Sequence, residues 1–177
     1  MTASGAAPVL PLVENPDDPL VRDIFDKLGG GILNLHRMMA HAPALMKASG
    51  DMAAAFRRDT ALPRAVAELA ILRAAQVLDA PYVFTRHVSL ARECGVTAQQ
   101  MRELASWPDS AAFTPAQKAA LSFTETAVRQ SSLDTSHIAE LRRHFSAREI
   151  VELAMVIGFY VSTAIFIKVL AVPAEKA

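Results

Sequence analysis

Apolar residues recur at helical spacing along most of this chain. The first set lies between residues 20 and 28: Val21, Ile24, Phe25 and Leu28. Steps of three or four residues place such side chains on one face of an α-helix. The composition is rich in alanine and poor in glycine, and no run alternates in the way of a half-buried strand. The pattern therefore predicts an all-α fold.

Two helices are predicted between Pro63 and Gly95, with a break at Asp79-Ala80-Pro81. The first helix is apolar almost all round and carries Glu68 near its middle. The second helix carries His87 on a stripe with Ala80, Val83 and Leu90. A carboxylate and an imidazole on adjoining apolar helices can form a compact acid/base pair, so Glu68 and His87 are the candidate catalytic residues.

Several helix starts can be read from capping signals. Thr97 with Gln100, and Ser146 with Glu149, have the spacing of a capping box. Thr114-Pro115 combines a cap with proline at the first helical position. Pro43 opens a helix to about Arg58, whose expected core contacts are Leu45, Met46, Met52 and Phe56.

The chain also contains an internal similarity. Residues 147–158 parallel residues 63–74, and Glu152 occupies the position of Glu68. A duplicated helical hairpin packed about a pseudo-twofold axis would produce this similarity. Two helices rich in alanine and leucine can also match by chance.

Charge and composition narrow the function classes. The 18 basic and 18 acidic residues cancel, so no net field attracts nucleic acid or an anionic membrane. The apolar run from Leu153 to Ile167 is shorter than the roughly 20 residues that cross a bilayer, which favours a buried core helix. Cys94 is the only cysteine, a composition that suits the reducing cytoplasm.

We expect residues 1–18 to form an extended N-terminal segment and residues 19–177 a single helical domain.

Metal binding is not expected. His36 and His41 are the nearest pair of histidines, and their spacing is poor for two ligands on one helical face. The methionines in this part of the chain are better read as core filler than as a cofactor site.

Several segments together resemble the carboxymuconolactone decarboxylase family: Asn34–Arg37, Ala40–Pro43, Ala67–Arg73, His87–Gly95 and Phe145–Leu153. The resemblance covers nearly the whole chain after residue 20. It implies an alkylhydroperoxidase D-like helical bundle built around a helical hairpin. It also implies a homo-oligomer, a trimer or hexamer with a dimer as the alternative, whose active sites lie near subunit contacts.

The sequence departs from both chemistries of this superfamily. The hydroperoxidase branch has a Glu, two cysteines three apart and a His, and here Glu68 and His87 match while Ala80 and Val83 stand at the cysteine positions. Without a thiolate there is no nucleophile to attack a peroxide. The decarboxylase branch often reads Glu-Trp-x-His-His at positions 83–87, where this chain keeps only the second His and has Arg86 in place of the first.

The resemblance implies substrate-binding roles for further residues. Arg86 would bind a substrate carboxylate through two hydrogen bonds while His87 moves a proton. Tyr82, His41 and Arg37 would complete the wall of the pocket. Structural roles compete with these: a hydrogen-bonded core histidine for His87, an ion pair with Arg64 for Glu68, and a subunit salt bridge for Arg86.

The resulting hypothesis is a lyase that needs no metal or organic cofactor. It would act on a small carboxylate, a lactone or an aromatic-degradation intermediate, by decarboxylation or proton transfer, with His87 as the acid/base. The alternative is a non-catalytic oligomer that binds small molecules or acts as a scaffold. A thiol hydroperoxidase is less favoured, because the redox cysteines are missing.

Overall fold

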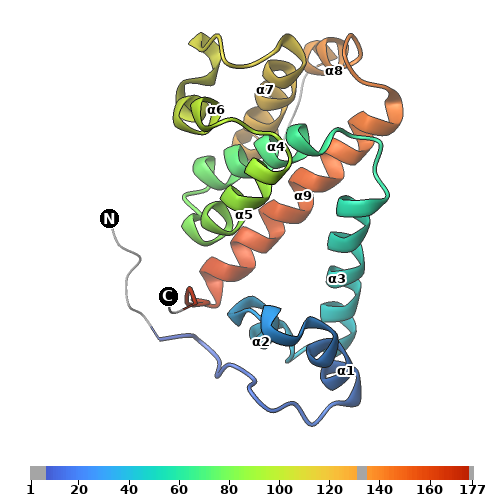
Figure 1. Ribbon diagram of the computed structural model, residues 1–177, viewed down its shortest axis with the longest axis vertical. Coiled ribbons are helices and arrows are strands. Elements are labelled where there is room, and N and C mark those ends of the chain that lie inside the picture. The colour runs from blue at the N-terminus through green and yellow to red at the C-terminus, as the bar shows by residue number, and fades with distance from the viewer. Residues whose placement is uncertain (1–6, 131–134, 176–177) are drawn as a thin grey trace. The chain divides into compact units, whose positions relative to one another are not determined.

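The computed structural model describes residues 7–130 and 135–175, and every regular element in those ranges is a helix (Figure 1). The elements are α1 (Pro19–Leu28), η1 (Gly29–Gly31), α2 (Asn34–Met39), α3 (Pro43–Arg58), α4 (Arg64–Val77), α5 (Pro81–Glu93), α6 (Ala98–Glu103), η2 (Leu104–Asp109), α7 (Pro115–Gln130), α8 (Thr135–Leu141) and α9 (Ala147–Val169). The all-α prediction is confirmed.

The chain divides into two compact units. The first unit comprises Met1–Arg58 and Phe166–Ala177, and the second comprises Asp59–Ile165. The prediction of a single domain over 19–177 stays a prediction. Of the expected extended segment, residues 1–6 lie outside the described residues, and residues 7–18 contain no helix.

Within the first unit, α1 begins at a capped end. The Asp18 carboxylate accepts hydrogen bonds from the backbone N–H groups of Leu20 and Val21 at 2.8 and 3.2 Å. The helix then buries Val21 and Phe25 against Ala40 and Met46.

The expected core of α3 was only half right. Met46 and Phe56 are buried, but Leu45 is 72% exposed and Met52 is 39% exposed. Leu45 directly precedes Met46, and neighbouring helical residues point about 100° apart. Leu45 and Met52 therefore share a second face of α3, which is not the one that packs.

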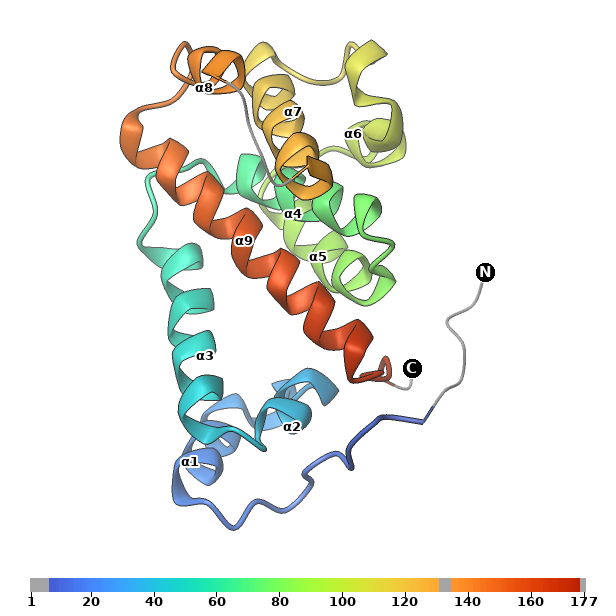
Figure 2. The ribbon, with the colours of Figure 1, turned by 180° about the vertical axis from the view of Figure 1, so that it is seen from behind.

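Helix α4 is the centre of the second unit. Every residue from Val66 to Ala75 is buried, and α4 packs against both α5 and α7 (Figures 1 and 2). A helix that is apolar all round must be covered on all sides, as the sequence pattern required. The predicted break follows: Asp79 adopts a positive φ of 48°, which aspartate tolerates better than most residues, and Pro81 starts α5.

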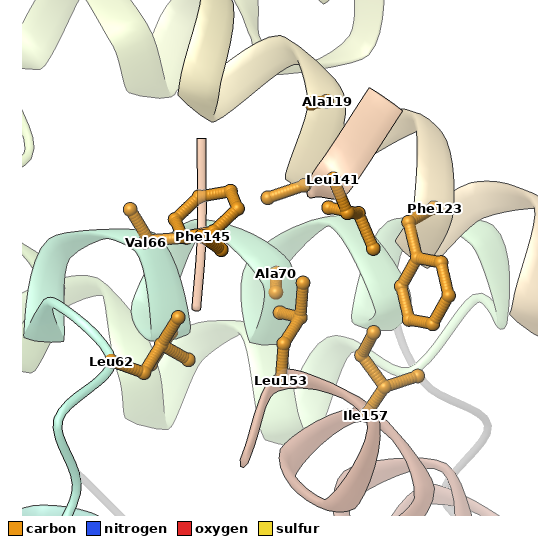
Figure 3. Close-up of a cluster of buried hydrophobic side chains, with 11 residues drawn as sticks. Leu62, Val66, Ala70, Ala119, Phe123, Leu141, Phe145, Leu153 and Ile157 are labelled. Atoms are coloured by element: carbon orange, nitrogen blue, oxygen red, sulfur yellow. The ribbon is translucent and has the colours of Figure 1, made fainter. Parts of the chain in front are cut away.

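Helix α9 also covers α4 with apolar side chains, in a cluster that includes residues of α7. Figure 3 shows Leu153 and Ile157 of α9 in one cluster with Val66 and Ala70 of α4 and with Leu62, which precedes that helix. The cluster contains Leu62, Val66, Ala67, Ala70, Ala119, Ala120, Phe123, Leu141, Phe145, Leu153 and Ile157. This packing holds α4 between α7 and α9, and with it the side chains that α4 presents to α5.

The capping signals are confirmed at residue level. Thr97 and Gln100 exchange side-chain-to-backbone hydrogen bonds at 3.1 and 3.0 Å, and Ser146 and Glu149 do so at 3.3 and 2.8 Å. Thr114 also accepts from the backbone N–H of Gln117 at 3.2 Å. Each pairing satisfies backbone donors that a helix start leaves free.

The long helix α9 is buried on one side only. Leu153, Val156 and Ile157 are buried, whereas Val151, Met155 and Ile165 are exposed. Length and composition alone would let α9 cross a membrane, a test that core helices of soluble proteins also pass, so this is weak evidence for a span. The expectation of a buried core helix therefore holds for one face and fails for the other.

Candidate active site

The two candidate catalytic residues meet in the second unit. Nδ1 of His87, on α5, lies 2.8 Å from Oε2 of Glu68, on α4. Glu68 is 1% exposed and His87 is 8% exposed, so the pair is almost withdrawn from water. An ionic or hydrogen-bonded pair in such surroundings interacts more strongly than it would in solvent.

The local sequence explains why these side chains face each other. Ala80, the N-cap of α5, recurs with Val83, His87 and Ala91 on the helix at steps of three and four, and all four are buried. The stripe predicted from the sequence had Leu90 as its last member; Leu90 is only half-buried, and its neighbour Ala91 is buried instead. The short connection between α4 and α5 then brings the stripe against α4, where Glu68 is the one acidic residue.

The second carboxylate oxygen of Glu68 has its own partner. Nη2 of Arg64 donates to Oε1 of Glu68 at 2.6 Å, one helical turn away on α4. Both predicted contacts of Glu68 are therefore present: one carboxylate oxygen pairs with Arg64, and the other binds His87. The ion pair with Arg64 supplies the counter-charge that a buried carboxylate needs.

This arrangement assigns the imidazole tautomer. An ionised carboxylate only accepts hydrogen bonds, so Nδ1 of His87 is the donor in this contact and Nε2 is the ring nitrogen left for proton transfer. No residue that the structure describes hydrogen-bonds to Nε2. Because every fully buried polar side-chain atom in residues 7–130 and 135–175 has a partner, Nε2 is not fully buried. It is the atom able to accept a proton.

A third residue, which sequence reasoning missed, contacts the imidazole. The rings of His87 and Tyr160 have centroids 4.6 Å apart and planes at 85°, an edge-to-face contact. Tyr160 lies on α9, within the long apolar run, and Phe159 packs edge-to-face against it at 5.2 Å. The sequence offered no signal for this contact beyond two aromatic residues in an apolar helix.

Tyr82 and Arg86 lie on another face of α5. They are one turn apart and so share a side of the helix, while Arg86 is about 100° around from its neighbour His87. Arg86 is exposed and Tyr82 is half-buried. The structure therefore places Tyr82 and Arg86 beside, and not on, the face of α5 that carries His87 of the Glu68–His87 pair (the dyad). Their substrate-binding role stays a prediction.

Arg37 and His41 belong to the first unit, where each contacts the N-terminal segment. Nε of Arg37 is 2.8 Å from Oε2 of Glu14, and Nε2 of His41 is 2.8 Å from the carbonyl oxygen of Pro11. These contacts hold residues 11–14 in place. The proposed role of Arg37 and His41 in a pocket wall also stays a prediction.

The internal similarity extends to side-chain contacts. Arg148 and Glu152 on α9 form the same one-turn ion pair as Arg64 and Glu68, at 2.8 Å. The other oxygen of Glu152, however, accepts the backbone N–H groups of Ala61 and Leu62, both at 2.8 Å. Burial raises the pKa of Glu152, but the hydrogen bonds from Arg148, Leu62 and Ala61 together hold it below its ordinary value. Glu152 therefore anchors the entry to α4, whereas Glu68 holds an imidazole.

A second charged cluster lies away from the dyad. Glu125 on α7 accepts hydrogen bonds from Arg73 at 3.2 Å, from Nε1 of Trp107 at 2.9 Å and from Arg129 at 3.0 Å. Burial raises the pKa of Glu125, but these hydrogen bonds and the charge of Arg73 outweigh it and lower the pKa below its ordinary value. Because donors from α4, η2 and α7 all bind this one carboxylate, the cluster connects η2 and α4 to α7.

Neither a metal cluster nor a dithiol accompanies the dyad in the described ranges. No three His, Cys, Asp or Glu side chains of residues 7–130 and 135–175 gather closely enough to hold a metal ion. Cys94 is half-buried at the C-terminal end of α5. Ala80 and Val83, which the resemblance to the hydroperoxidase branch puts at the cysteine positions, are buried on the His87 stripe.

Solved structures share this fold. A peroxidase-related protein from Silicibacter sp. TM1040 superposes with a TM-score of 0.81 at 19% identity, covering 99% of this chain and 95% of its own. An alkylhydroperoxidase AhpD core protein from Ralstonia eutropha JMP134 gives 0.74 at 17% identity, covering 94% of both chains. A variant of the debrominase Bmp8, in complex with 2,3,4-tribromopyrrole, gives 0.73 at 20% identity, covering 89% of this chain and 84% of its own. At these identities the likeness establishes the fold.

The family match covers a shorter part of the chain than the resemblance of its motifs. The family model of the carboxymuconolactone decarboxylase family matches residues 43–126. That span includes α4 and α5, and therefore both Glu68 and His87. The segment that carries both residues is therefore similar to the carboxymuconolactone decarboxylase family, and the alkylhydroperoxidase D-like fold of the solved structures agrees with that likeness.

Proposed function

We propose that the chain is a cofactor-independent lyase that decarboxylates, or moves a proton at carbon in, a small organic acid. The observation that carries the proposal is the buried hydrogen bond between Glu68 and His87, which leaves Nε2 as an accessible acid/base atom. A His whose other nitrogen is held by a carboxylate is the arrangement that general acid/base catalysis uses repeatedly. Arg64 supplies a counter-charge to the same carboxylate.

The proposed step needs only residues of this chain and water. In a β-keto acid or an unsaturated lactone acid, the bond between the carboxylate carbon and its neighbour breaks. The electron pair of that bond enters the adjacent conjugated carbonyl, and CO2 leaves. Protonated His87 then delivers its Nε2 proton to the carbon, and water returns a proton to the imidazole. For a simple proton shift, neutral Nε2 removes the proton from carbon and gives it back at another position.

Arg86 is proposed to bind the substrate carboxylate. Its guanidinium is exposed on α5, one residue before the imidazole, and guanidinium groups bind carboxylates through two parallel hydrogen bonds. An acid that lies across the edge of α5 could reach both side chains. Tyr82, one turn before Arg86 on the same face, is proposed to border this acid.

The related structures support a small substrate without defining its chemistry. The debrominase was solved with a halogenated pyrrole, a compact planar ring, which supports a substrate of similar size here. The peroxidase-related proteins do not support peroxide chemistry in this chain. Buried alanine and valine stand where the redox cysteines would be, and Cys94 lies at the far end of α5.

The proposal is tested by a ligand screen followed by a rate measurement. The purified protein would be heated with carboxymuconolactone, β-keto acids and aromatic carboxylates, and ligands that raise the melting temperature would be assayed for CO2 release. We expect a stabilising acid that is also turned over. In the Arg86→Ala variant KM should rise roughly 10-fold or more, while Arg92→Ala, an exposed arginine further along α5, should leave KM unchanged.

Three outcomes would reject parts of this proposal. Stabilisation without turnover of any bound acid would leave the chain as a small-molecule binding protein of this fold. Equal effects of Arg86→Ala and Arg92→Ala would remove Arg86 from the site. Peroxide turnover that disappears in Cys94→Ser would replace the lyase with a thiol peroxidase.

We further propose that the chain forms a homo-oligomer. Val151, Met155 and Ile165 are exposed at helical spacing on α9, with the small residues Gly158 and Ser162 between them. Apolar faces of this kind are rarely left in water. A Met155→Lys variant should elute as a smaller species in size exclusion with light scattering. Ala105→Lys, on exposed η2, should not; identical masses for both variants would remove this face from any interface.

A further inference from the structure

One hydrogen bond does not orient an imidazole fully. The contact between Nδ1 of His87 and Glu68 fixes one ring atom, 2.8 Å from its acceptor. The second side-chain torsion of histidine is broad, so the ring could still tilt around that anchor. Tilting would move Nε2, the atom that the proposed chemistry uses. Another group must therefore set the plane of the ring.

Tyr160 is placed to do this. Its ring meets the imidazole edge-to-face, with centroids 4.6 Å apart and an angle of 85° between the planes. Edge-to-face contacts between aromatic rings are directional, because the positive edge of one ring faces the negative face of the other. A contact this close on one side of the imidazole blocks the tilt that Glu68 alone allows.

The orientation of Tyr160 is itself supported on α9. Phe159 packs against the Tyr160 ring at 5.2 Å and 84°. The carbonyl oxygen of Phe159 accepts hydrogen bonds from the hydroxyls of Ser162 and Thr163 at 2.8 and 2.9 Å. Nearer the start of the helix, Ile157 is packed into the cluster around α4. The tyrosine thus projects from a well-fixed stretch of backbone.

We propose that Tyr160 is a positioning residue that fixes the plane of the His87 ring and so aims Nε2 at the substrate. Its contribution to catalysis rests on the proposed acid/base role of His87. Its effect on the imidazole does not, because the contact exists without substrate. Glu68 determines which nitrogen carries the proton, and Tyr160 determines where the other nitrogen points.

The test is nuclear magnetic resonance of the histidine ring nitrogens in the ligand-free protein. Wild type should give one His87 species with the proton on Nδ1. Tyr160→Phe keeps the ring and should reproduce that spectrum. Tyr160→Leu removes the ring plane and should give broadened or mixed-tautomer His87 signals. Phe123→Leu, a buried aromatic replacement in the α4–α7–α9 cluster, which does not include Tyr160 or His87, should leave the His87 signals unchanged.

Kinetics provide the second readout once a substrate is known. Tyr160→Leu should lower kcat roughly 10-fold or more while KM stays near that of wild type, and Tyr160→Phe should stay within about twofold of wild type. Should Tyr160→Leu fail to fold, Tyr160→Met fills a similar volume without an aromatic plane and should behave as predicted for Leu.

Wild-type His87 signals in both Tyr160→Leu and Tyr160→Met would overturn the inference. Equal disturbance in Tyr160→Phe would also overturn it, because the hydroxyl and not the ring would then be responsible. Neither result depends on turnover. A protein with no lyase activity but with a Tyr160-dependent imidazole would reject the proposed function and leave the positioning contact standing.

Discussion

Nδ1 of His87 and Oε2 of Glu68 lie 2.8 Å apart and join α5 to α4 at a buried point. The relationship assigns the proton to Nδ1, because the carboxylate can only accept. It also leaves Nε2 as the reactive nitrogen. The predictions about the site follow from this one contact and from the second oxygen of Glu68, which Arg64 holds at 2.6 Å.

Replacing Glu68 by glutamine should weaken both catalysis and folding. The amide keeps the shape but can turn its NH2 group toward Nδ1, which favours the wrong tautomer, and it no longer neutralises Arg64. We expect kcat to fall roughly 10²-fold and the free energy of unfolding to fall by about 1–3 kcal/mol. Urea unfolding and steady-state kinetics measure these two effects.

Glu68→Asp is the control for that variant. It retains the charge but withdraws the carboxylate by one methylene, so activity should fall. The carboxylate can still only accept from Nδ1, so the tautomer signals should stay closer to wild type than those of Glu68→Gln. A Glu68→Gln protein with wild-type kcat would show that the dyad is structural only.

Glu125 gives a pH-dependent prediction. Its pKa is lower in the folded protein than in the unfolded chain, so folding is stabilised above the unfolded pKa and this stability is lost as pH falls through the folded value. The Glu125→Gln variant should therefore lose less stability on acidification than wild type does. Trp107, the only tryptophan, donates to this carboxylate and reports the change by its fluorescence.

Parallel acid titrations of wild type and Glu125→Gln supply the comparison. Wild-type Trp107 emission should change in the acid range before global unfolding, and the variant should lack that step. The same fluorescence transition in both proteins would place the titrating group elsewhere.

Glu152 and Glu68, which occupy equivalent positions in the internal similarity, should have different roles: Glu152 in stability and Glu68 in the state of His87. Glu152→Ala removes the acceptor of two backbone N–H groups, those of Ala61 and Leu62, and should cost about 1–2 kcal/mol of unfolding free energy. It should leave the His87 tautomer unchanged. Arg148→Ala, which removes a largely exposed partner, should cost less than about 1 kcal/mol.

Chemical denaturation of both variants, with the His87 spectrum as a second readout, decides this point. A mixed-tautomer His87 spectrum in Glu152→Ala would mean that the segment before α4 is coupled to the dyad, which would contradict the separate roles of Glu152 and Glu68.

The sequence predicted the elements better than it predicted their partners. Capping boxes and proline positions depend on residues three or four apart, so Thr97 with Gln100 and Ser146 with Glu149 were readable directly. The dyad was readable because Glu68 and His87 break otherwise apolar stripes on consecutive helices. Both predictions rest on local information.

Contacts between segments far apart in the sequence could not be predicted from it. Tyr160 lies in an apolar helix whose pattern does not show which aromatic meets the imidazole. Leu45 and Met52 on α3 were assigned to the core because helical spacing identifies a face but not whether that face is covered. Burial depends on which elements pack together, and a single sequence carries little of that information.

The central claim is that Nε2 of His87 transfers the proton. His87→Asn tests it most directly, because the asparagine NH2 can take the place of Nδ1 beside Glu68 while nothing replaces Nε2. The measurement is CO2 release, with deuterium incorporation from D2O into the product, for wild type and His87→Asn on the acids that stabilise the protein. We predict wild-type turnover with deuterium at carbon and a loss of about 10²–10⁴-fold in the variant. Equal rates in the two proteins, or no turnover of any stabilising acid by wild type, would contradict the account.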